Sequence, residues 1–120
     1  MKAVFDTNIL IDYLKGITEA RDELERFSKK YISIISYIET LVGVGSSFFQ
    51  EVVDFLESFE IIPVNKTVAD LSVMIRQQYK LKIPDAIILA SAQSLEALLV
   101  TRNAKDFPIT MPMVRLPYQI

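Results

Sequence analysis

Residues 2–8 read Lys2-Ala3-Val4-Phe5-Asp6-Thr7-Asn8, an apolar run that ends abruptly at an acid. The apolar part predicts a short buried strand, and Asp, Thr and Asn are typical of the turn that follows a strand. Residues 9–14 then have a helical pattern. A strand, a turn and a helix in this order predict the start of a βαβ unit, with Asp6 at the carboxyl end of the strand.

Short apolar segments and helical segments alternate along the rest of the chain. We expect further strands near residues 31–34, 59–64 and 98–100, and an edge strand in the proline-containing tail. The expected helix starts are the N-caps Thr18, Ser36, Ser47 and Asn65 or Thr67, and Pro84 as a first helical residue. Apolar strands that alternate with helices predict a three-layer α/β/α fold with a mainly parallel sheet. No linker interrupts the pattern, so we expect a single domain over residues 1–120.

The composition limits the chemistry that the chain can perform. Hydrophobic residues make up 51% of its 120 residues, enough for a core, and there is no Cys, His or Trp. Without Cys and His, a disulfide framework, a zinc–thiolate site and a thiol nucleophile are excluded, and the commonest general base is missing. Any catalysis must therefore use carboxylates, Lys or Arg, hydroxyls, or a metal held by oxygen ligands.

The charges are unevenly distributed along the chain. The net charge is −2, but residues 31–60 carry five acids and no Lys or Arg, whereas residues 61–120 carry seven basic and four acidic residues. The second half can therefore meet an anionic partner. No segment has the length and apolar character of a signal peptide or of a membrane span, so we expect a cytoplasmic protein with no membrane contact.

Several acids fall where α/β proteins bind ligands. Asp6 follows one expected strand and residues 101–103 follow another, so parallel neighbouring strands would bring them into one crevice. Glu39 and Asp85 lie in apolar segments that we expect to be largely buried. A lone buried carboxylate costs several kcal/mol, and three together would repel one another. A hard divalent cation such as Mg²⁺ or Mn²⁺ would relieve this repulsion.

Each of these acids also has an interpretation that involves no metal. Asp6 is a suitable N-cap for the helix at residue 9, Glu39 fits the N3 position of a capping box that starts at Ser36, and Asp85 suits the first turn of a helix. The two interpretations are compatible, because a metal ligand can also cap a helix. Residue types alone leave both open.

Four segments together resemble the PIN-domain nucleases, especially the toxins of VapBC toxin–antitoxin pairs. They are Val4-Phe5-Asp6-Thr7-Asn8-Ile9-Leu10-Ile11-Asp12, Ser33-Ile34-Ile35-Ser36-Tyr37-Ile38-Glu39-Thr40-Leu41, Ile83-Pro84-Asp85-Ala86-Ile87-Ile88-Leu89-Ala90 and Leu99-Val100-Thr101-Arg102-Asn103-Ala104-Lys105-Asp106-Phe107. The resemblance covers roughly residues 1–107. It implies a PIN-like fold and metal-dependent cleavage of RNA, with Mg²⁺ or Mn²⁺ held by Asp6, Glu39 and Asp85.

The chain departs from the family at one site residue. Many relatives have a fourth acid where this chain has Asn103, so the resemblance implies one metal site and leaves a second as a possibility. Asn103 would still take part by hydrogen bonding, and Asp106 would lie at the rim. The hydroxyls of Thr7, Ser36 and Thr101 would orient the carboxylates, although a capping role remains equally open for Ser36.

The resemblance also implies contacts with RNA and with other proteins. Arg102 and Lys105 flank the expected site and would hold RNA phosphates. Three further cations extend this track or are ordinary surface residues: Arg76, Lys80 and Lys82. The apolar stripe of residues 48–59 is either core or a face that receives an antitoxin helix or a second subunit. The family resemblance implies a homodimer that is inhibited by an antitoxin.

Other functions fit parts of the pattern. A haloacid-dehalogenase-type phosphatase needs a second Asp where this chain has Asn8, and a phospho-receiver domain needs an acid pair and a late Lys, neither of which is clear. A PIN-like binding module without catalysis and a stand-alone RNA-processing nuclease without an antitoxin remain as alternatives. The intact acids Asp6, Glu39 and Asp85 argue against the binding module.

Overall fold

A computed structural model describes residues 1–120, in which strands and helices alternate. The strands are β1 (Lys2–Phe5), β2 (Lys29–Ser33), β3 (Glu60–Ile62), β4 (Leu98–Val100) and β5 (Val114–Arg115). The helices are α1 (Thr7–Leu14), α2 (Thr18–Glu25), α3 (Ile34–Val44), α4 (Phe49–Glu57), α5 (Lys66–Tyr79) and α6 (Ile83–Ser94).

The five strands form one sheet in the order β3-β2-β1-β4-β5, and every neighbouring pair is parallel. The predicted α/β fold with a mainly parallel sheet is confirmed. β1 lies at the centre of the sheet, where Val4 is opposite Tyr31 of β2 and Leu99 of β4. The carboxyl ends of β1 and β4 therefore lie side by side at one edge, because parallel strands end in the same direction.

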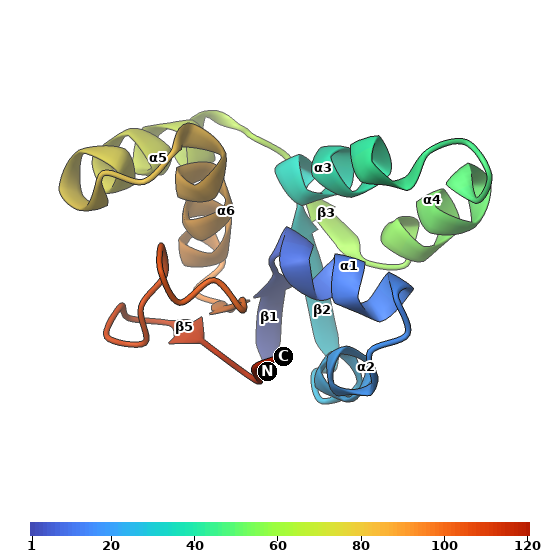
Figure 1. The fold of residues 1–120 in the computed structure, drawn as a ribbon. Coiled ribbons are helices and arrows are strands. Elements are labelled where there is room, and N and C mark those ends of the chain that lie inside the picture. Colours follow the sequence, from blue (N-terminus) through green and yellow to red (C-terminus); the bar gives the residue numbers. More distant parts are fainter.

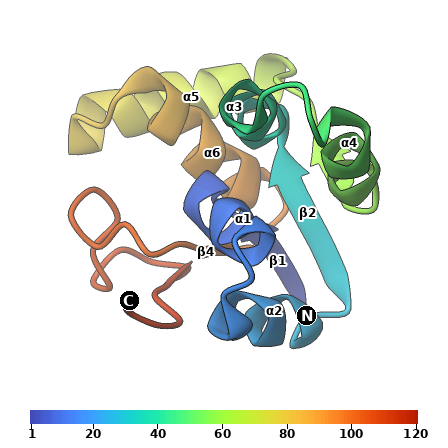
Figure 2. The same cartoon turned by 45° about the vertical axis from the view of Figure 1, so that its right-hand side comes forward.

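Helices cover both faces of the sheet and give the predicted three layers (Figure 1). Val4 and Leu99 point into a core that α5 and α6 complete, whereas Phe5 and Val100 point into a second core with α1, α2 and α4. This alternation follows from the two-residue period of side chains along a strand. Helix α3 contributes to both cores and lies beyond the carboxyl ends of the strands, as the turned view shows (Figure 2).

Most helix starts lie close to the predicted positions, but two expected capping boxes are wrong. Asn65 caps α5 as predicted, since its Oδ1 accepts a hydrogen bond of 2.9 Å from the Val68 N–H. Ser33, not Ser36, caps α3. Because β2 runs directly into the helix, the Ser-x-x-Glu pattern at Ser36 lies inside it. Ser47 is not a cap either: α4 begins after Phe48, which makes no side-chain capping bond.

Two other helix starts are shifted by one residue. Ile17 occupies the N-cap of α2, so Thr18 is its first helical residue, and α6 begins at Ile83, so Pro84 is its second. The proline-containing tail supplies the short strand β5, which lies at the edge of the sheet as expected.

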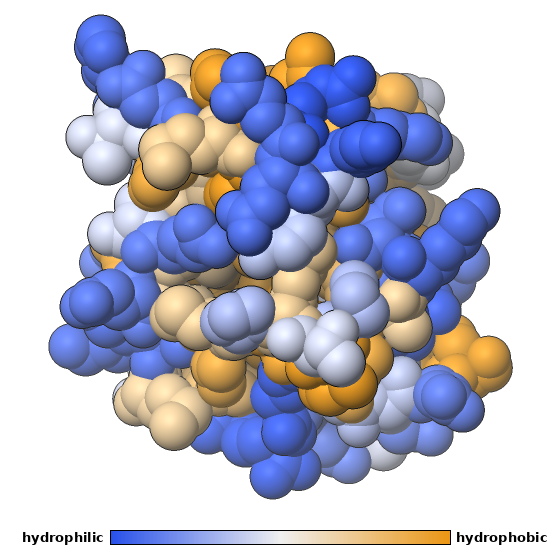
Figure 3. All heavy atoms as spheres, turned by 90° about the vertical axis from the view of Figure 1, so that its left-hand side faces the viewer, coloured by the Kyte–Doolittle hydropathy of each residue, from blue (hydrophilic) through white to orange (hydrophobic).

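The surface offers no continuous apolar belt on the side that carries α5 and the C-terminal tail. Hydrophobic side chains there lie in separate patches between hydrophilic ones (Figure 3). None of the six helices is long and apolar enough to cross a membrane.

Candidate metal-binding active site

Asp6 lies at the carboxyl end of the central strand β1, beside the end of its neighbour β4. It follows β1 directly, and its backbone N–H donates to the carbonyl of Val100 at the end of β4, over 2.9 Å. Its side chain is only 4% exposed. Oδ1 accepts a hydrogen bond of 2.8 Å from the Thr7 N–H and so caps α1, while Oδ2 accepts one of 2.7 Å from the Thr101 hydroxyl. The expected capping role of Asp6 is confirmed, and Thr101 orients this carboxylate.

Asn8 is a site residue whose role we did not predict. Its Nδ2 lies 3.2 Å from both Asp6 Oδ2 and the Thr101 hydroxyl oxygen, and its Oδ1 accepts a hydrogen bond of 3.1 Å from the Arg102 N–H. Asn8 thus joins the end of β1 to the loop after β4. Its position two residues after Asp6, at a helix start, was the only signal in the sequence.

Glu39 reaches the same edge of the sheet from α3. The Thr7 hydroxyl donates a hydrogen bond of 2.6 Å to Glu39 Oε1 and lies 3.1 Å from Ser36 Oγ. Ser36 is buried, but Glu39 is exposed, so the expected burial of Glu39 is wrong. Helix α3 lies beyond the ends of the strands and turns Glu39 to solvent together with Ile38. The capping role of Ser36 is wrong as well, whereas its hydroxyl does lie beside Thr7.

Asp85 enters the site from the first turn of α6, where it is half-buried. Burial raises the pKa of Asp85, and the negative charges of Asp106 and then Glu39 raise it further. Asp106 is held by Asn103: the Asn103 amide donates to Asp106 Oδ2 over 2.9 Å, and the Asp106 N–H donates to Asn103 Oδ1 over 3.2 Å. Asn103 therefore faces Asp106, which places a fourth carboxylate beside Asp85.

These four carboxylates form no ion pair with a cation. Burial, Asp106 and Glu39 together raise the pKa of Asp85 by more than the charge of Lys82 lowers it. Burial raises the pKa of Asp6 to about 6 against the lowering effect of its hydrogen bonds with Thr101 and Thr7, and the charges of Asp85 and Glu39 add to the rise. All five ion pairs of the structure lie elsewhere.

The donor set fits a hard divalent cation, which prefers carboxylate oxygens. No three acids already converge on one point as finished metal ligands. Of the three expected ligands, Asp6 is buried, Asp85 is half-buried and Glu39 is exposed.

Arg102 points to an unexpected partner. Its Nε and Nη2 donate to the two carboxylate oxygens of Asp12 over 2.5 and 3.0 Å, and the Tyr118 hydroxyl donates to Asp12 Oδ2 over 2.8 Å. Two of the three guanidinium nitrogens are thus used inside the protein. Lys105, three residues further along the loop, is exposed and forms no ion pair.

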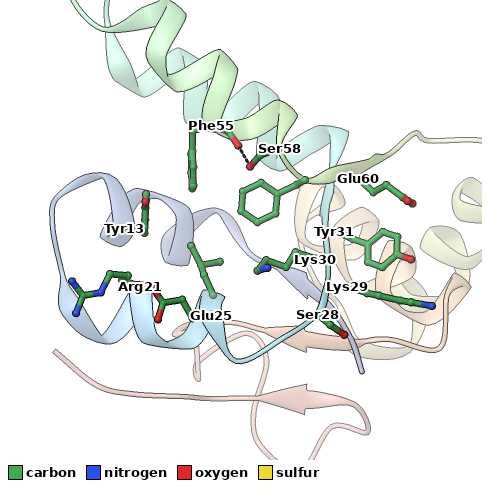
Figure 4. Close-up of a pocket in the computed structure, with 12 residues that line it drawn as sticks. Tyr13, Arg21, Glu25, Ser28, Lys29, Lys30, Tyr31, Phe55, Ser58 and Glu60 are labelled. Atoms are coloured by element: carbon green, nitrogen blue, oxygen red, sulfur yellow. Dashed lines mark hydrogen bonds between the residues drawn. The ribbon is translucent and has the colours of Figure 1, made fainter.

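A cavity of about 700 Å³ lies away from these acids. Lys30, Tyr31 and the stacked rings of Tyr13 and Phe55, whose centroids are 4.6 Å apart, are among the residues that line it (Figure 4). Lys29 and Glu60, the first residues of β2 and β3, line it too, so this cavity lies at the amino ends of these two strands. The acid cluster at the carboxyl ends is a separate site.

The sequence model of one protein family, the PIN domain, matches residues 3–109, which is most of the chain. The chain belongs to the PIN-domain family. The resemblance of the four segments is therefore confirmed. The PIN-domain match includes β1 to β4, all six helices and every acid described above.

Individual relatives of this PIN-domain chain are also similar over most of their length. A chain in a toxin–antitoxin complex from Klebsiella pneumoniae is 46% identical, with 98% of this chain and 99% of that chain covered and a TM-score of 0.93. A chain of VapBC2 from Rickettsia felis, bound to a DNA fragment from its promoter, is 25% identical, with 96% and 98% covered and a TM-score of 0.81. Ribonuclease VapC10 of Mycobacterium tuberculosis is 29% identical over 112 residues, 87% of this chain and 84% of that protein.

Proposed function

We propose that this PIN-domain chain is a metal-dependent endoribonuclease and the toxin of a type II toxin–antitoxin pair. The observation that carries the proposal is the set of carboxylates Asp6, Glu39 and Asp85, which meet without an ion pair where two parallel strands end. The similarity to a ribonuclease and to a toxin–antitoxin complex supports it.

In the proposed site, some residues would hold the metal ion and others would orient those ligands. Mg²⁺ or Mn²⁺, when bound, would activate water and neutralise charge at the scissile phosphate. Asp6, Glu39 and Asp85 would hold the ion, with Thr101 and Asn8 orienting Asp6. Thr7 and Ser36 would do the same for Glu39.

Asn103 would act by presenting Asp106 to the site. The carboxylate of Asp106 then supplies the fourth negative charge that Asn103 itself lacks. For this reason we propose one metal site with these ligands and keep a second ion as a possible addition.

RNA would approach along the loop that follows β4. The exposed Lys105 would contact a phosphate, and Arg102 would contribute through the Nη1 nitrogen that Asp12 does not use. In-line attack of water at phosphorus would leave a 5′-phosphate and a 3′-hydroxyl. The reaction would take place in the cytoplasm, with the whole chain acting as one PIN-like domain.

The antitoxin would cover an apolar surface on α4. The stripe of residues 48–59 is divided: Val52 and Leu56 are buried in the core, but Phe48 and Phe49 are 66% and 47% exposed. Phe48 also lines a mainly apolar groove of about 400 Å³ together with Leu14 and Val44. An amphipathic antitoxin helix suits such a groove.

A second copy of the chain would cover another apolar surface, between α5 and α6. Val73 and Ile83 are 57% and 61% exposed and line an apolar groove of about 390 Å³. We propose that the homodimer implied by the family forms here. Sedimentation of the parent chain and of a Val73→Glu variant tests this, because the variant should shift toward the monomer.

The function is tested by incubating the purified chain with RNA in Mg²⁺, in Mn²⁺ and in a chelator. We expect cleavage only with metal, and none by the Asp85→Asn variant, whose fold circular dichroism would verify. Cleavage in the chelator, or by Asp85→Asn at the parental rate, would make the assignment wrong. RNA binding without cleavage would favour the non-catalytic module, and the absence of a neighbouring small gene would favour a stand-alone nuclease.

A further inference from the structure

Asp12 forms a buried ion pair that the proposed chemistry does not use. The residue is 1% exposed, and its two carboxylate oxygens accept three hydrogen bonds, two from Arg102 and one from Tyr118. Burial alone would raise the pKa of Asp12, but the bonds from Arg102 and Tyr118 and the charge of Arg102 hold it below its usual value. The pair is therefore fully ionised and fully satisfied at neutral pH.

The same ion pair fixes the loop that completes the acid cluster. Asn8 and Asp12 are four residues apart and so share one face of α1. From this face Asn8 accepts the Arg102 backbone N–H, and Asp12 holds the Arg102 side chain. One residue is thus clamped at two points one helical turn apart.

The clamped residue stands between two groups of the site. Thr101, just before it, donates to Asp6 Oδ2, and Asn103, just after it, holds Asp106. The segment from Thr101 to Asp106 forms no strand or helix, although the Thr101 N–H donates to the Arg115 carbonyl over 3.1 Å. The bonds from Asn8 and Asp12 fix the next residue, Arg102, and so help to determine where the Thr101 hydroxyl lies. A substitution of Asp12 would therefore alter the orientation of Asp6 through two adjacent residues, Arg102 and Thr101.

Tyr118 brings the C-terminal tail into this arrangement. It is separated from Asp12 by 106 residues, and its hydroxyl supplies the third hydrogen bond to that carboxylate. Its ring packs against the core beneath α1. The tail is thereby joined to the ion pair by a side-chain hydrogen bond.

We propose that Asp12 and Tyr118 are positioning residues of the nuclease site, which act through Arg102 to hold Thr101 in place against Asp6. This inference rests on the proposed metal-dependent nuclease function. The competing explanation is that the ion pair only stabilises the fold.

A second ion pair in the same protein provides a matched control for that explanation. Glu23 is 3% exposed and accepts bonds of 2.5 and 3.0 Å from Arg115, across 92 residues. It links α2 to β5 with almost the same geometry, but its side chains touch none of the acids of the site. The backbone of Arg115 does reach the loop, because its carbonyl accepts a hydrogen bond of 3.1 Å from the Thr101 N–H in the pairing of β4 with β5. Glu23→Gln removes only the side-chain ion pair and leaves this backbone bond in place, so we expect it to weaken the fold without displacing Thr101.

The experiment compares full-length Asp12→Asn, Tyr118→Phe and Glu23→Gln with the parent chain, well below their melting temperatures. It measures the dissociation constant of Mn²⁺ from the free-ion electron paramagnetic resonance signal, and kcat and KM for RNA. We expect Asp12→Asn to weaken Mn²⁺ binding roughly tenfold, the lower end for residues that orient metal ligands. Tyr118→Phe should weaken it about threefold, in keeping with one lost hydrogen bond. In both, kcat should fall while KM does not rise, and Glu23→Gln should keep the parental values.

Two results would overturn the proposal in distinguishable ways. If the parent chain binds Mn²⁺ and cleaves RNA, and Asp12→Asn and Tyr118→Phe only lower the melting temperature as Glu23→Gln does, the ion pair is structural. If the parent chain neither binds Mn²⁺ nor cleaves RNA, the nuclease function fails and the positioning role fails with it. Should Asp12→Asn not fold, Tyr118→Phe decides by the same measurements, because it removes a single hydroxyl.

Discussion

The hydroxyl of Thr101 donates a hydrogen bond of 2.7 Å to Oδ2 of Asp6, a residue 95 positions away in the chain. Both side chains are buried, and the other carboxylate oxygen of Asp6 caps α1. The orientation of this acid is therefore determined from two sides by the protein alone. This rigidity is what a metal ligand needs, because each ligand that is already in place lowers the cost of binding the ion.

Replacing Thr101 by Val should test that rigidity, because Val has the same shape and lacks the hydroxyl. We expect Mn²⁺ affinity to fall roughly tenfold, as for other residues that orient ligands. The free energy of unfolding should fall by about 1–3 kcal/mol, because Asp6 and Asn8 lose a buried partner. Calorimetric titration and urea unfolding measure the two effects. The control is Ser72→Ala, which removes a buried hydroxyl of α5 that bonds only to the Val68 carbonyl; equal Mn²⁺ affinity in both variants would contradict the role of Thr101.

The raised pKa of Asp6 predicts that the metal-free protein becomes more stable in mild acid. The pKa of Asp6 is about 6 in the folded chain against an ordinary value of 3.8, so the contribution of Asp6 to stability is fully present below pH 3.8 and is lost as the pH rises through 6. The full difference is about 3 kcal/mol. Urea unfolding of the parent and of Asp6→Asn at pH 7 and pH 5, without divalent ions, measures the contribution of Asp6 to the free energy of unfolding.

The Asp6→Asn variant should be the more stable protein at pH 7, because Asn also caps helices well and carries no charge. Its advantage over the parent should shrink at pH 5. It should also lose RNA cleavage. A parent chain that loses stability relative to Asp6→Asn on acidification would show that the sign of the pKa shift is wrong.

The charge of Asp106 should influence the titration of Asp85. Because the negative charge of Asp106 raises the pKa of Asp85, Asp106→Asn should lower the pKa of Asp85. Carbon-detected NMR titration of the Asp carboxyl groups measures this directly. Asp70→Asn, on the exposed surface of α5, is the control and should leave Asp85 unchanged. An unaltered Asp85 pKa in Asp106→Asn would mean that Asp106 lies outside the acid cluster.

Lys105 should contribute one phosphate contact to RNA binding. Lys105→Ala should weaken binding of a non-cleaved RNA and reduce the slope of log K against log salt by about 1. Fluorescence anisotropy at several salt concentrations, with Asp85→Asn as the background to prevent cleavage, gives this slope. Lys66→Ala removes an exposed cation that is paired with Asp70 on α5, and it should keep the slope. Identical slopes for the two variants would remove Lys105 from the interface.

The fold and the edge that carries the acids were predictable from the sequence because they depend on local patterns. Two apolar runs, one that ends at Asp6 and one that ends before Thr101, each predict a buried strand and the position of its carboxyl end. Parallel pairing of β1 with β4 then brings the two ends together. Asp6 as a helix cap was readable for the same reason.

The errors have equally physical causes. Ser36 and Glu39 fit a capping box by spacing, but β2 runs into α3 without a turn, so the N-cap, Ser33, lies three residues before the expected one. Glu39 lies in an apolar segment, yet only part of the apolar residues of α3 face the two cores, and Glu39 points outward on the same side as the exposed Ile38 and Val42. Asp12, Arg102 and Tyr118 meet across about ninety residues or more, and no local pattern marks such a contact.

The central position of β1 has a consequence for how the protein comes into being. β1 is synthesised well before its neighbour β4, so Asp6 lacks its partner Thr101 for part of translation. At roughly 5–20 residues per second, the 95 residues between them take about 5–20 s. A growing chain therefore cannot assemble the acid site until Thr101 has been made and has left the ribosome.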